Sequence, residues 1–348
     1  MLLNQVSYVM VRYQKDRGMM MGSSKKPKVI AYIDLPEPII DQIKEHCEVV
    51  SFQSIHEDQA TFYNELKDCH GLIGADLPIN KALLQQAPEL KIVSNISVGY
   101  ENFDLEAMTA YGVIGTNTPG VIETTADAMM GLLLAAARRI PELDQFVKEK
   151  KWTDLIGMEH YGVDVHKRTL GIIGMGKIGY AVAKRAHFGF DMDILYHNRT
   201  RHLEREEAIQ AKYCELEELL RKSDFVLMMA SANEESKYLM DKAQFSLMQP
   251  NAIFINGSRG QNVNEGALIT ALKNGQIYGA ALDVFETEPV SSDNELLQLK
   301  NVITVPHIGS ATFHTRLQMV QMAITNLIQG LTNETPSNIL NKEVLETR

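Results

Sequence analysis

The chain has 348 residues, of which 45% are hydrophobic and 22% are charged, and these proportions exclude an intrinsically disordered or collagen-like protein. Its formal net charge is −10, so the overall charge provides no attraction to nucleic acid or to an anionic membrane surface. The apolar runs are of strand length, and none reaches the roughly 18 consecutive apolar residues of a membrane-spanning helix. The length exceeds that of a usual single domain, so we expect two domains.

The three cysteines, Cys47, Cys69 and Cys214, are odd in number and widely spaced. This pattern fits neither a disulfide framework nor the spacing of metal ligands, so we expect no metal site and a reducing, cytoplasmic location. Residues 1–27 lack a basic start followed by a clean apolar core. We interpret them as an N-terminal extension and not as a secretion signal.

From Lys28 onward, short β-branched runs alternate with amphipathic stretches. The strand candidates in this part of the chain are KVIAYI, GLIG, KIVSNIS and VIGTN. Such an alternation predicts a parallel sheet with crossover helices. The sequence NTPG near residue 119 then interrupts the pattern, and we place a domain boundary there.

The next stretch, VIETTADAMMGLLLAAARRIPELDQFVKEKKW, is predicted to be one long helix with an N-terminal cap at Thr124 or Thr125. Pro141 lies near its middle and should kink or divide it, because proline cannot complete the helical hydrogen bonds.

Six further strand candidates follow, and helical connections join them. They are residues 170–174, 193–198, 225–230, 252–258, 279–285 and 302–307. This series predicts a doubly wound sheet of the dinucleotide-binding type. A final helix is expected after it, with an apolar stripe formed by Leu317, Val320, Ile324, Leu327 and Leu331.

The first strand of the second series runs into a glycine-rich turn. Gly174, Gly176 and Gly179 have the G-x-G-x-x-G spacing, directly after a strand and at the start of a helix. The first glycine allows a tight turn, the second lets a pyrophosphate approach the backbone, and the third packs the helix on the strand. We therefore predict dinucleotide binding by Gly174, Met175, Gly176, Lys177, Ile178 and Gly179.

The following strand ends in LYHNRTR, where an NAD site usually carries an acidic residue for the ribose hydroxyl. Hydrogen-bond donors and positive charge are offered instead by His197, Asn198, Arg199, Thr200 and Arg201. A guanidinium can bind a 2′-phosphate bidentately, so the sequence favours NADP(H), with NAD(H) still possible. The alternative is that these are ordinary solvated loop residues.

Three candidate catalytic residues each follow a strand of the second series. Arg259 ends the fourth strand, Glu288 stands after the fifth and His307 stands after the sixth. Because the carboxyl ends of parallel strands share one crevice, these side chains can meet beside a bound nicotinamide. Singly, each residue has a structural or solvent-exposed alternative role.

The motifs SVGYENFD, GIIGMGKIG, NGSRG, LDVFETEP and PHIGSAT stand in the order and spacing of the D-isomer-specific 2-hydroxyacid dehydrogenase family. The chain resembles this family from about residue 28 to 335, and most of all its glyoxylate/hydroxypyruvate and 2-ketogluconate reductases. The resemblance implies an α/β protein with two doubly wound parallel sheets. A Rossmann dinucleotide-binding domain, residues 121–308, would be inserted into a discontinuous flavodoxin-like substrate domain, residues 28–120 and 309–348.

The same resemblance implies the reduction of a small 2-keto acid to a D-2-hydroxy acid. Such a reaction needs a proton donor at the carbonyl oxygen, and His307 would serve, with Glu288 favouring its imidazolium form. Arg259 would bind the substrate's carboxylate and polarise its carbonyl. The backbone amides around Val98 and Gly99 would also bind the carboxylate.

Further roles follow from the family pattern. Asp283 would orient the nicotinamide carboxamide, and Leu77 would form an apolar wall for the substrate. The stretch ASANEESKY departs from relatives, which commonly carry a proline and threonines there, although Ser231 can still donate a hydrogen bond to the cofactor. Family members usually form homodimers through the dinucleotide domain, and the apolar helix near 126–140 is the expected contact.

Two other interpretations remain open. One is an NAD-linked member of the family, such as a phosphoglycerate-type dehydrogenase; a formate dehydrogenase is disfavoured because it carries glutamine where Glu288 stands. The other is a non-catalytic, dinucleotide-sensing corepressor built on the same scaffold.

Overall fold

The computed structural model describes residues 26–55 and 58–346, which divide into two compact units. The predicted N-terminal extension, residues 1–27, lies outside the described residues except for its last two. Along the chain, unit 1 consists of the described residues up to Asn95, Phe103–Thr116 and the residues from Ile324 on, and unit 2 consists of Ile96–Asn102 and Asn117–Ala323.

Unit 1 contains a five-stranded sheet in which every strand pair is parallel, in the order β2-β1-β3-β4-β5. This is the doubly wound order of flavodoxin-like folds, as expected. The strands are β1 (Lys28–Ala31), β2 (Glu48–Ser51), β3 (Gly71–Gly74), β4 (Ile92–Asn95) and β5 (Ile114–Thr116). Strand β2 was not predicted, because this edge strand has no fully buried residue to give it an apolar signature.

Helices cover both faces of this sheet. They are α2 (Glu37–Lys44), α3 (Gln59–Glu65), α4 (Lys81–Leu84), α5 (Leu105–Ala110) and the C-terminal part of α13 (Phe313–Leu331). Asp58, Asn80 and Asp104 begin α3, α4 and α5 by accepting a hydrogen bond from a first-turn amide. Helix α13 approaches the sheet closely, since a Cβ on Gly71 would lie 2.8 Å from Leu327.

Unit 2 contains a seven-stranded parallel sheet in the order β12-β11-β10-β9-β6-β7-β8. Its strands are β6 (Thr169–Ile173), β7 (Asp193–His197), β8 (Lys212–Tyr213), β9 (Phe225–Met228), β10 (Ile253–Asn256), β11 (Gly279–Leu282) and β12 (Val302–Thr304). The six predicted strands are all present, and the Rossmann-type fold is confirmed. The seventh strand, β8, pairs at the sheet edge over two residues, too short a stretch to show a pattern.

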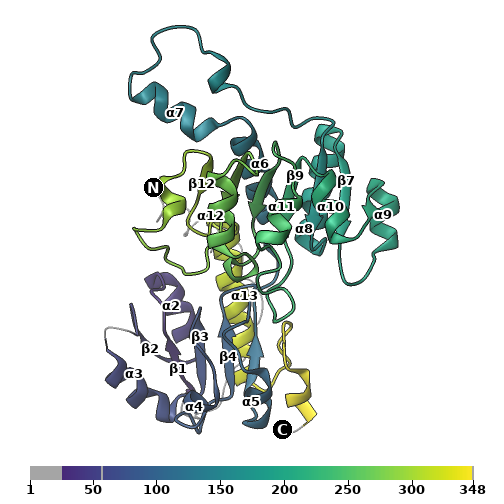
Figure 1. The fold of residues 1–348 in the computed structure, drawn as a ribbon. Coiled ribbons are helices and arrows are strands. Elements are labelled where there is room, and N and C mark those ends of the chain that lie inside the picture. The colour runs from purple at the N-terminus through teal and green to yellow at the C-terminus, as the bar shows by residue number, and fades with distance from the viewer. Residues whose placement is uncertain (1–25, 56–57, 347–348) are drawn as a thin grey trace. The chain divides into compact units, whose positions relative to one another are not determined.

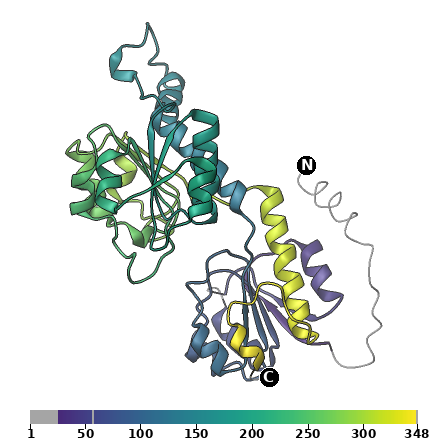
Figure 2. The same cartoon turned by 90° about the vertical axis from the view of Figure 1, so that its right-hand side faces the viewer.

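Helices cover both faces of this sheet, as Figure 2 shows, and the buried side chains of its strands alternate between the two cores that these helices cover. Leu227 of β9 joins the core under α6 (Ile122–Ala137) and α8 (Lys177–Phe190), whereas Val226 faces the core under the opposite helices. The opposite layer is formed by α10 (Leu216–Lys222), α11 (Lys242–Leu247) and α12 (Glu265–Lys273). Over the described part of the chain, no helix is long and apolar enough to cross a membrane.

The predicted long helix is divided in two, α6 and α7 (Ile140–Lys148), as Pro141 suggested. The break lies at Arg139, which has a left-handed φ of 54°, and Pro141 falls in the first turn of α7, where its missing N–H costs nothing. The prediction of a cap at Thr124 or Thr125 is wrong. Helix α6 begins earlier, and no side chain caps it.

The apolar residues of α6 are already covered within unit 2. Met129, Leu132 and Leu133 are buried in the core beside α8 and the sheet. These side chains are therefore not available for a dimer contact, and the prediction that the helix near 126–140 makes one stays a prediction. The large apolar residues that are exposed in this region are Ile140 and Val147 of α7 and several in the segment after α7, which Figure 1 shows extending away from the sheet of unit 2.

Candidate functional site

The glycine turn after β6 has the shape that a pyrophosphate site needs. Gly174 has a φ of 95°, and a Cβ there would lie 2.4 Å from the backbone nitrogen of Ala230, so only glycine fits. A Cβ on Gly179 would lie 2.7 Å from the Gly174 carbonyl oxygen. A Cβ on Gly176 would meet nothing within 4 Å, so open space lies above the N-terminus of α8, which Lys177 and Ile178 begin. These residues fit a dinucleotide.

Two side chains hold the peptide groups of Met175 in this turn. The Met175 N–H donates to Asn198 Oδ1 at 2.6 Å, and Arg205 donates from its terminal nitrogen to the Met175 carbonyl oxygen at 2.9 Å. Arg205 comes from α9 (Leu203–Ile209) and lies over the Tyr180 ring, with 5.3 Å between Cζ and the ring centroid. Asn198, predicted as a cofactor contact, thus shapes the loop, and Arg205 was not predicted because its helix carries no motif.

Arg199 and Thr200, which were also predicted as cofactor contacts, are exposed. Arg199 forms an ion pair with Glu235 at 3.2 Å, with 79% and 75% of the two side chains exposed. Thr200 is exposed beside it. Arg201 instead makes two hydrogen bonds to Glu206, which hold the pKa of that carboxyl at about 2. Arg199 is therefore the more weakly held of the two guanidinium groups.

The stretch ASANEESKY forms a hydrogen-bonded turn after β9. Ser231 is exposed, and its carbonyl oxygen accepts from the Ser236 hydroxyl at 2.8 Å. The Asn233 side chain accepts from two backbone N–H groups, those of Glu235 and Ser236. Polar side chains thus replace the proline and threonines expected in this loop.

In the other half of the strand order, Glu288 follows β11 and His307 follows β12, and the two side chains form a pair. His307 Nδ1 lies 2.8 Å from Glu288 Oε2, and Glu288 Oε1 accepts from the Phe285 N–H at 3.0 Å. His307 adopts a left-handed φ of 51°, and its own N–H donates to the Asp283 carbonyl oxygen at 3.0 Å. Since Nδ1 is bonded to Glu288, Nε2 is the ring nitrogen that can reach a substrate.

Asp283 fixes the loop that carries His307. Its side chain is buried, and its two oxygens accept from the Ile308 N–H at 2.6 Å and the Gly309 N–H at 2.9 Å. Burial raises the pKa of Asp283. The structure therefore places Asp283 as the link between the end of β11 and the histidine loop, and its predicted nicotinamide contact stays a prediction.

The electrostatics of the pair favour charge on both partners. The hydrogen bond with Glu288 raises the pKa of His307 above its usual 6.5, and this effect exceeds the opposing effects of burial and of Arg259. Burial alone would raise the pKa of Glu288, but the hydrogen bonds from His307 and from the Phe285 amide, with the nearby positive charges, lower it overall. Because the charge of Arg259 lowers both pKa values, all three predicted catalytic groups lie within electrostatic range of one another.

Arg259 is brought to this place by the residue after it. A Cβ on Gly260 would lie 1.8 Å from the carbonyl carbon of Phe285, so only glycine lets the arginine loop approach the loop that carries Glu288. The Arg259 carbonyl oxygen accepts from Asn256 Nδ2 at 3.2 Å. A terminal nitrogen of the Arg259 guanidinium donates to the Ser258 carbonyl oxygen at 2.8 Å.

The short segment Ile96–Asn102 also belongs to unit 2 and reaches Arg259. Arg259 Nε lies 3.2 Å from Glu101 Oε1, and its second terminal nitrogen lies 3.4 Å from Glu101 Oε2. A Cβ on Gly99 would lie 2.0 Å from that nitrogen, so the guanidinium rests against the Gly99 backbone. Val98 adjoins, with its carbonyl oxygen accepting from Asn117 at 2.7 Å. Glu101 was not predicted, since 158 residues separate it from Arg259.

The remaining predicted site residue, Leu77, belongs to unit 1. Its side chain is buried in the core of that unit together with Tyr32 and Phe103.

Among the residues that the structure describes, no group of three or more histidine, cysteine or acidic side chains could hold a metal ion.

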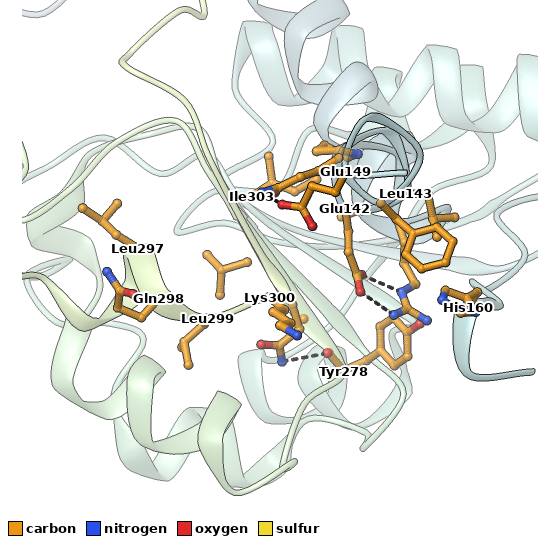
Figure 3. Close-up of a pocket in the computed structure, with 18 of the residues that line it drawn as sticks. Glu142, Leu143, Glu149, His160, Tyr278, Leu297, Gln298, Leu299, Lys300 and Ile303 are labelled. Carbon is orange, nitrogen blue, oxygen red and sulfur yellow. Dashed lines mark hydrogen bonds and ion pairs between the residues drawn. The ribbon is translucent and has the colours of Figure 1, made fainter. Parts of the chain in front are cut away.

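A cavity of about 670 Å³ lies elsewhere in unit 2, between α7, β12 and the 3-10 helix Glu295–Gln298. Figure 3 shows its lining, in which Arg139 makes two hydrogen bonds of 2.8 Å to Glu142 beside Tyr278. None of the predicted catalytic or cofactor-binding residues lines this cavity. It is therefore separate from the site described above.

Comparison with known proteins identifies the family of this chain. The family model described as "D-isomer specific 2-hydroxyacid dehydrogenase, NAD binding domain" matches residues 130–309. The chain is 46% identical over 320 residues to glyoxylate/hydroxypyruvate reductase B of Salmonella newport (strain SL254), covering 91% of this chain and 99% of the relative. The chain belongs to the D-isomer-specific 2-hydroxyacid dehydrogenase family. It is an NAD(P)-dependent enzyme that interconverts 2-keto acids and 2-hydroxy acids.

Solved structures show the same fold over nearly the whole chain. An NADPH-dependent glyoxylate/hydroxypyruvate reductase from Sinorhizobium meliloti, in complex with NADP and malonate, is similar with a TM-score of 0.82 at 30% identity, over 92% of this chain and 98% of that one. A protein from Thermus thermophilus is similar with a TM-score of 0.84 at 34% identity, over 90% of this chain and 99% of that one. These matches confirm the expected family and fold class.

Proposed function

We propose that this enzyme reduces a small 2-keto acid, of the glyoxylate, hydroxypyruvate or 2-ketogluconate type, to the D-2-hydroxy acid with NADPH. The observation that carries the proposal is the His307–Glu288 pair, whose Nδ1 to Oε2 distance is 2.8 Å. Glu288 favours the protonated form of the imidazole, since its hydrogen bond raises the histidine pKa. A charged imidazole aimed by a carboxylate is a proton donor for a carbonyl oxygen.

The chain's own residues bind and orient the reactants. The nicotinamide cofactor supplies the hydride when it is bound. His307 donates its Nε2 proton to the substrate's carbonyl oxygen, and Glu288 stabilises the imidazolium before that transfer. Arg259 neutralises negative charge on the same oxygen and on the substrate's carboxylate. Asp283 holds the histidine loop through the Ile308 and Gly309 amides.

The substrate's carboxylate is proposed to bind at the segment that contains Val98 and Gly99. The Arg259 guanidinium rests against Gly99, so backbone amides and a fixed positive charge lie together in unit 2. Unit 1 is proposed as the substrate domain, with Leu77 as an apolar wall, and unit 2 as the dinucleotide-binding domain. Asp283 is also proposed to orient the nicotinamide carboxamide.

The preference for NADPH is proposed from the loop after β7. Asn198, Arg199 and Thr200 follow this strand without an acidic residue, and Arg199 is held only by an exposed ion pair that a phosphate can replace. Ser231 is proposed to donate to the cofactor from the neighbouring turn. The Sinorhizobium meliloti relative, whose structure contains NADP, is described as NADPH-dependent.

The proposed partner is a second copy of the chain, bound through unit 2. The segment after α7 leaves large apolar side chains exposed, namely Trp152, Leu155, Ile156 and Met158. Several exposed apolar side chains within one short segment are typical of an interaction surface. The mass of the intact chain in solution, measured by light scattering, checks this proposal.

The function is tested by steady-state kinetics with glyoxylate, hydroxypyruvate and 2-ketogluconate, each with NADPH and with NADH. We expect turnover of at least one keto acid, with a higher kcat/KM for NADPH. Higher kcat/KM with NADH would favour the NAD-linked interpretation. Binding of both dinucleotides without turnover of any keto acid would contradict the proposed reaction and favour a sensor.

A further inference from the structure

Every nitrogen of the Arg259 guanidinium faces an acceptor within the protein. One terminal nitrogen donates to the Ser258 carbonyl oxygen at 2.8 Å. The other two nitrogens, which form the side-on edge, face the two carboxylate oxygens of Glu101 at 3.2 and 3.4 Å. A side-on, two-pronged arrangement is the geometry in which a carboxylate binds arginine best. Glu101 thus occupies the edge that an incoming carboxylate would use.

The position of this edge is fixed by the backbone around it. The guanidinium lies so close to Gly99 that a Cβ there would come within 2.0 Å of it and within 2.4 Å of Glu101 Oε2. The edge therefore faces the segment Ile96–Asn102, where the backbone amides proposed to bind the substrate also lie. The Glu101 carboxylate and the substrate's carboxylate would therefore bind the same edge of the Arg259 guanidinium.

We propose that Glu101 is a specificity-determining residue, whose carboxylate occupies the substrate-binding edge of Arg259 in the free enzyme and is displaced by the substrate's own carboxylate. The inference rests on the proposed function, because it requires Arg259 to bind the substrate's anionic group. It makes Glu101 an internal competitor that sets how strongly a small anion must bind before it can enter.

The burial of the two side chains suits an exchangeable contact. The Arg259 side chain is 33% exposed and that of Glu101 is 44% exposed, so the displaced carboxylate can be rehydrated without crossing the protein interior. A pair with this much exposure is worth roughly a factor of two to five in an equilibrium constant. A substrate that binds both Arg259 and backbone amides overcomes such a competitor, whereas an anion that binds Arg259 alone gains little.

The test compares Glu101→Gln with Glu106→Gln, a matched control that removes the same charge from an exposed residue of α5. Two quantities are measured for each variant: the Kd of oxalate for the enzyme with NADP bound, by calorimetry, and kcat and KM for glyoxylate with NADPH. In Glu101→Gln we expect both the Kd of oxalate and the KM of glyoxylate to fall about two- to fivefold, with kcat unchanged. Glu106→Gln should leave all three as in the wild type.

The opposite results are distinct. If Glu101 instead orients Arg259 for the reaction, Glu101→Gln lowers kcat and does not tighten oxalate binding, and the inference is overturned. Unchanged Kd and KM overturn it as well. Glu101→Ala repeats the measurement without the amide, and NADPH fluorescence shows that each variant is folded. A wild-type protein that binds oxalate but reduces no keto acid would contradict the proposed function. The oxalate affinity of Glu101→Gln would still show whether Glu101 competes with an anion for Arg259.

Discussion

The carboxyl ends of β10 to β12 and the loop after β7 both carry residues of the proposed reaction, yet they hold them very differently. At the first place, Glu288 is fixed by His307 and by the Phe285 amide, and the histidine loop is fixed by the buried Asp283. At the second, Arg199 is 79% exposed and pairs with a carboxylate that is 75% exposed.

The difference follows from what each place must do. A proton donor and a charge clamp are effective only if they are oriented before the reaction, because reorienting them afterwards would add to the barrier. A residue that recognises a phosphate needs no such rigidity, since the phosphate brings its own charge and organises an exposed arginine on binding. Substitutions at the two places should therefore affect different kinetic constants.

The largest expected effect comes from His307. We expect His307→Asn to lower kcat by about 10²- to 10⁴-fold, the usual contribution of a positioned proton donor, while NADPH binding is retained. Asparagine is chosen because the residue has a φ of 51°, which asparagine tolerates better than alanine. Stopped-flow or steady-state reduction of glyoxylate measures kcat, and fluorescence titration measures NADPH binding.

The control for this substitution is His46→Ala, an exposed histidine of unit 1, which should reduce glyoxylate like the wild type. Substantial turnover by His307→Asn would mean that another group donates the proton. Loss of both NADPH binding and turnover would instead indicate a structural role for His307.

Much of this site could be predicted from the sequence because strand ends converge by topology. Once six parallel strands were recognised, Arg259, Glu288 and His307 had to face one edge of the sheet, and their electrostatic coupling agrees. The glycine spacing likewise predicted a turn in which Gly174 has a positive φ.

Other features left no local signal. Glu101 meets Arg259 across 158 residues of sequence, and nothing in SVGYENFD distinguishes its carboxylate from a solvated one. Arg205 reaches the glycine turn from the face of a seven-residue helix, where an arginine usually points to solvent. Contacts of this kind depend on tertiary placement, which periodicity and spacing do not encode.

A smaller effect, confined to high pH, is expected at Glu288. In the wild type the raised pKa of His307 keeps the imidazole protonated above pH 6.5, so kcat/KM should be flat at low pH and fall as the pH rises through that raised pKa. Glu288→Gln removes the negative charge, while burial and Arg259 still lower the pKa. The fall should then begin at lower pH, and each unit of displacement costs about tenfold at high pH.

The matched control is Glu286→Gln, which removes one negative charge two residues before Glu288. The Glu286 side chain accepts from the Glu265 N–H and not from His307. Its pH profile should follow that of the wild type. An unchanged profile in Glu288→Gln would show that the carboxylate does not set the protonation of His307, and the proposed pairing would lose its catalytic meaning.

The smallest expected effect comes from Arg199, in the exposed loop after β7. Arg199→Ala should raise the KM for NADPH about five- to tenfold, as expected for the loss of one exposed charge-assisted contact, and leave the KM for NADH and both kcat values nearly unchanged. Arg221→Ala, which removes a guanidinium from another exposed ion pair, is the control and should change neither KM. Equal increases for the two cofactors would mean that Arg199 does not recognise the extra phosphate. A fall in kcat would mean instead that this loop is as closely coupled to the reacting groups as the histidine loop, and the contrast between the two places would not hold.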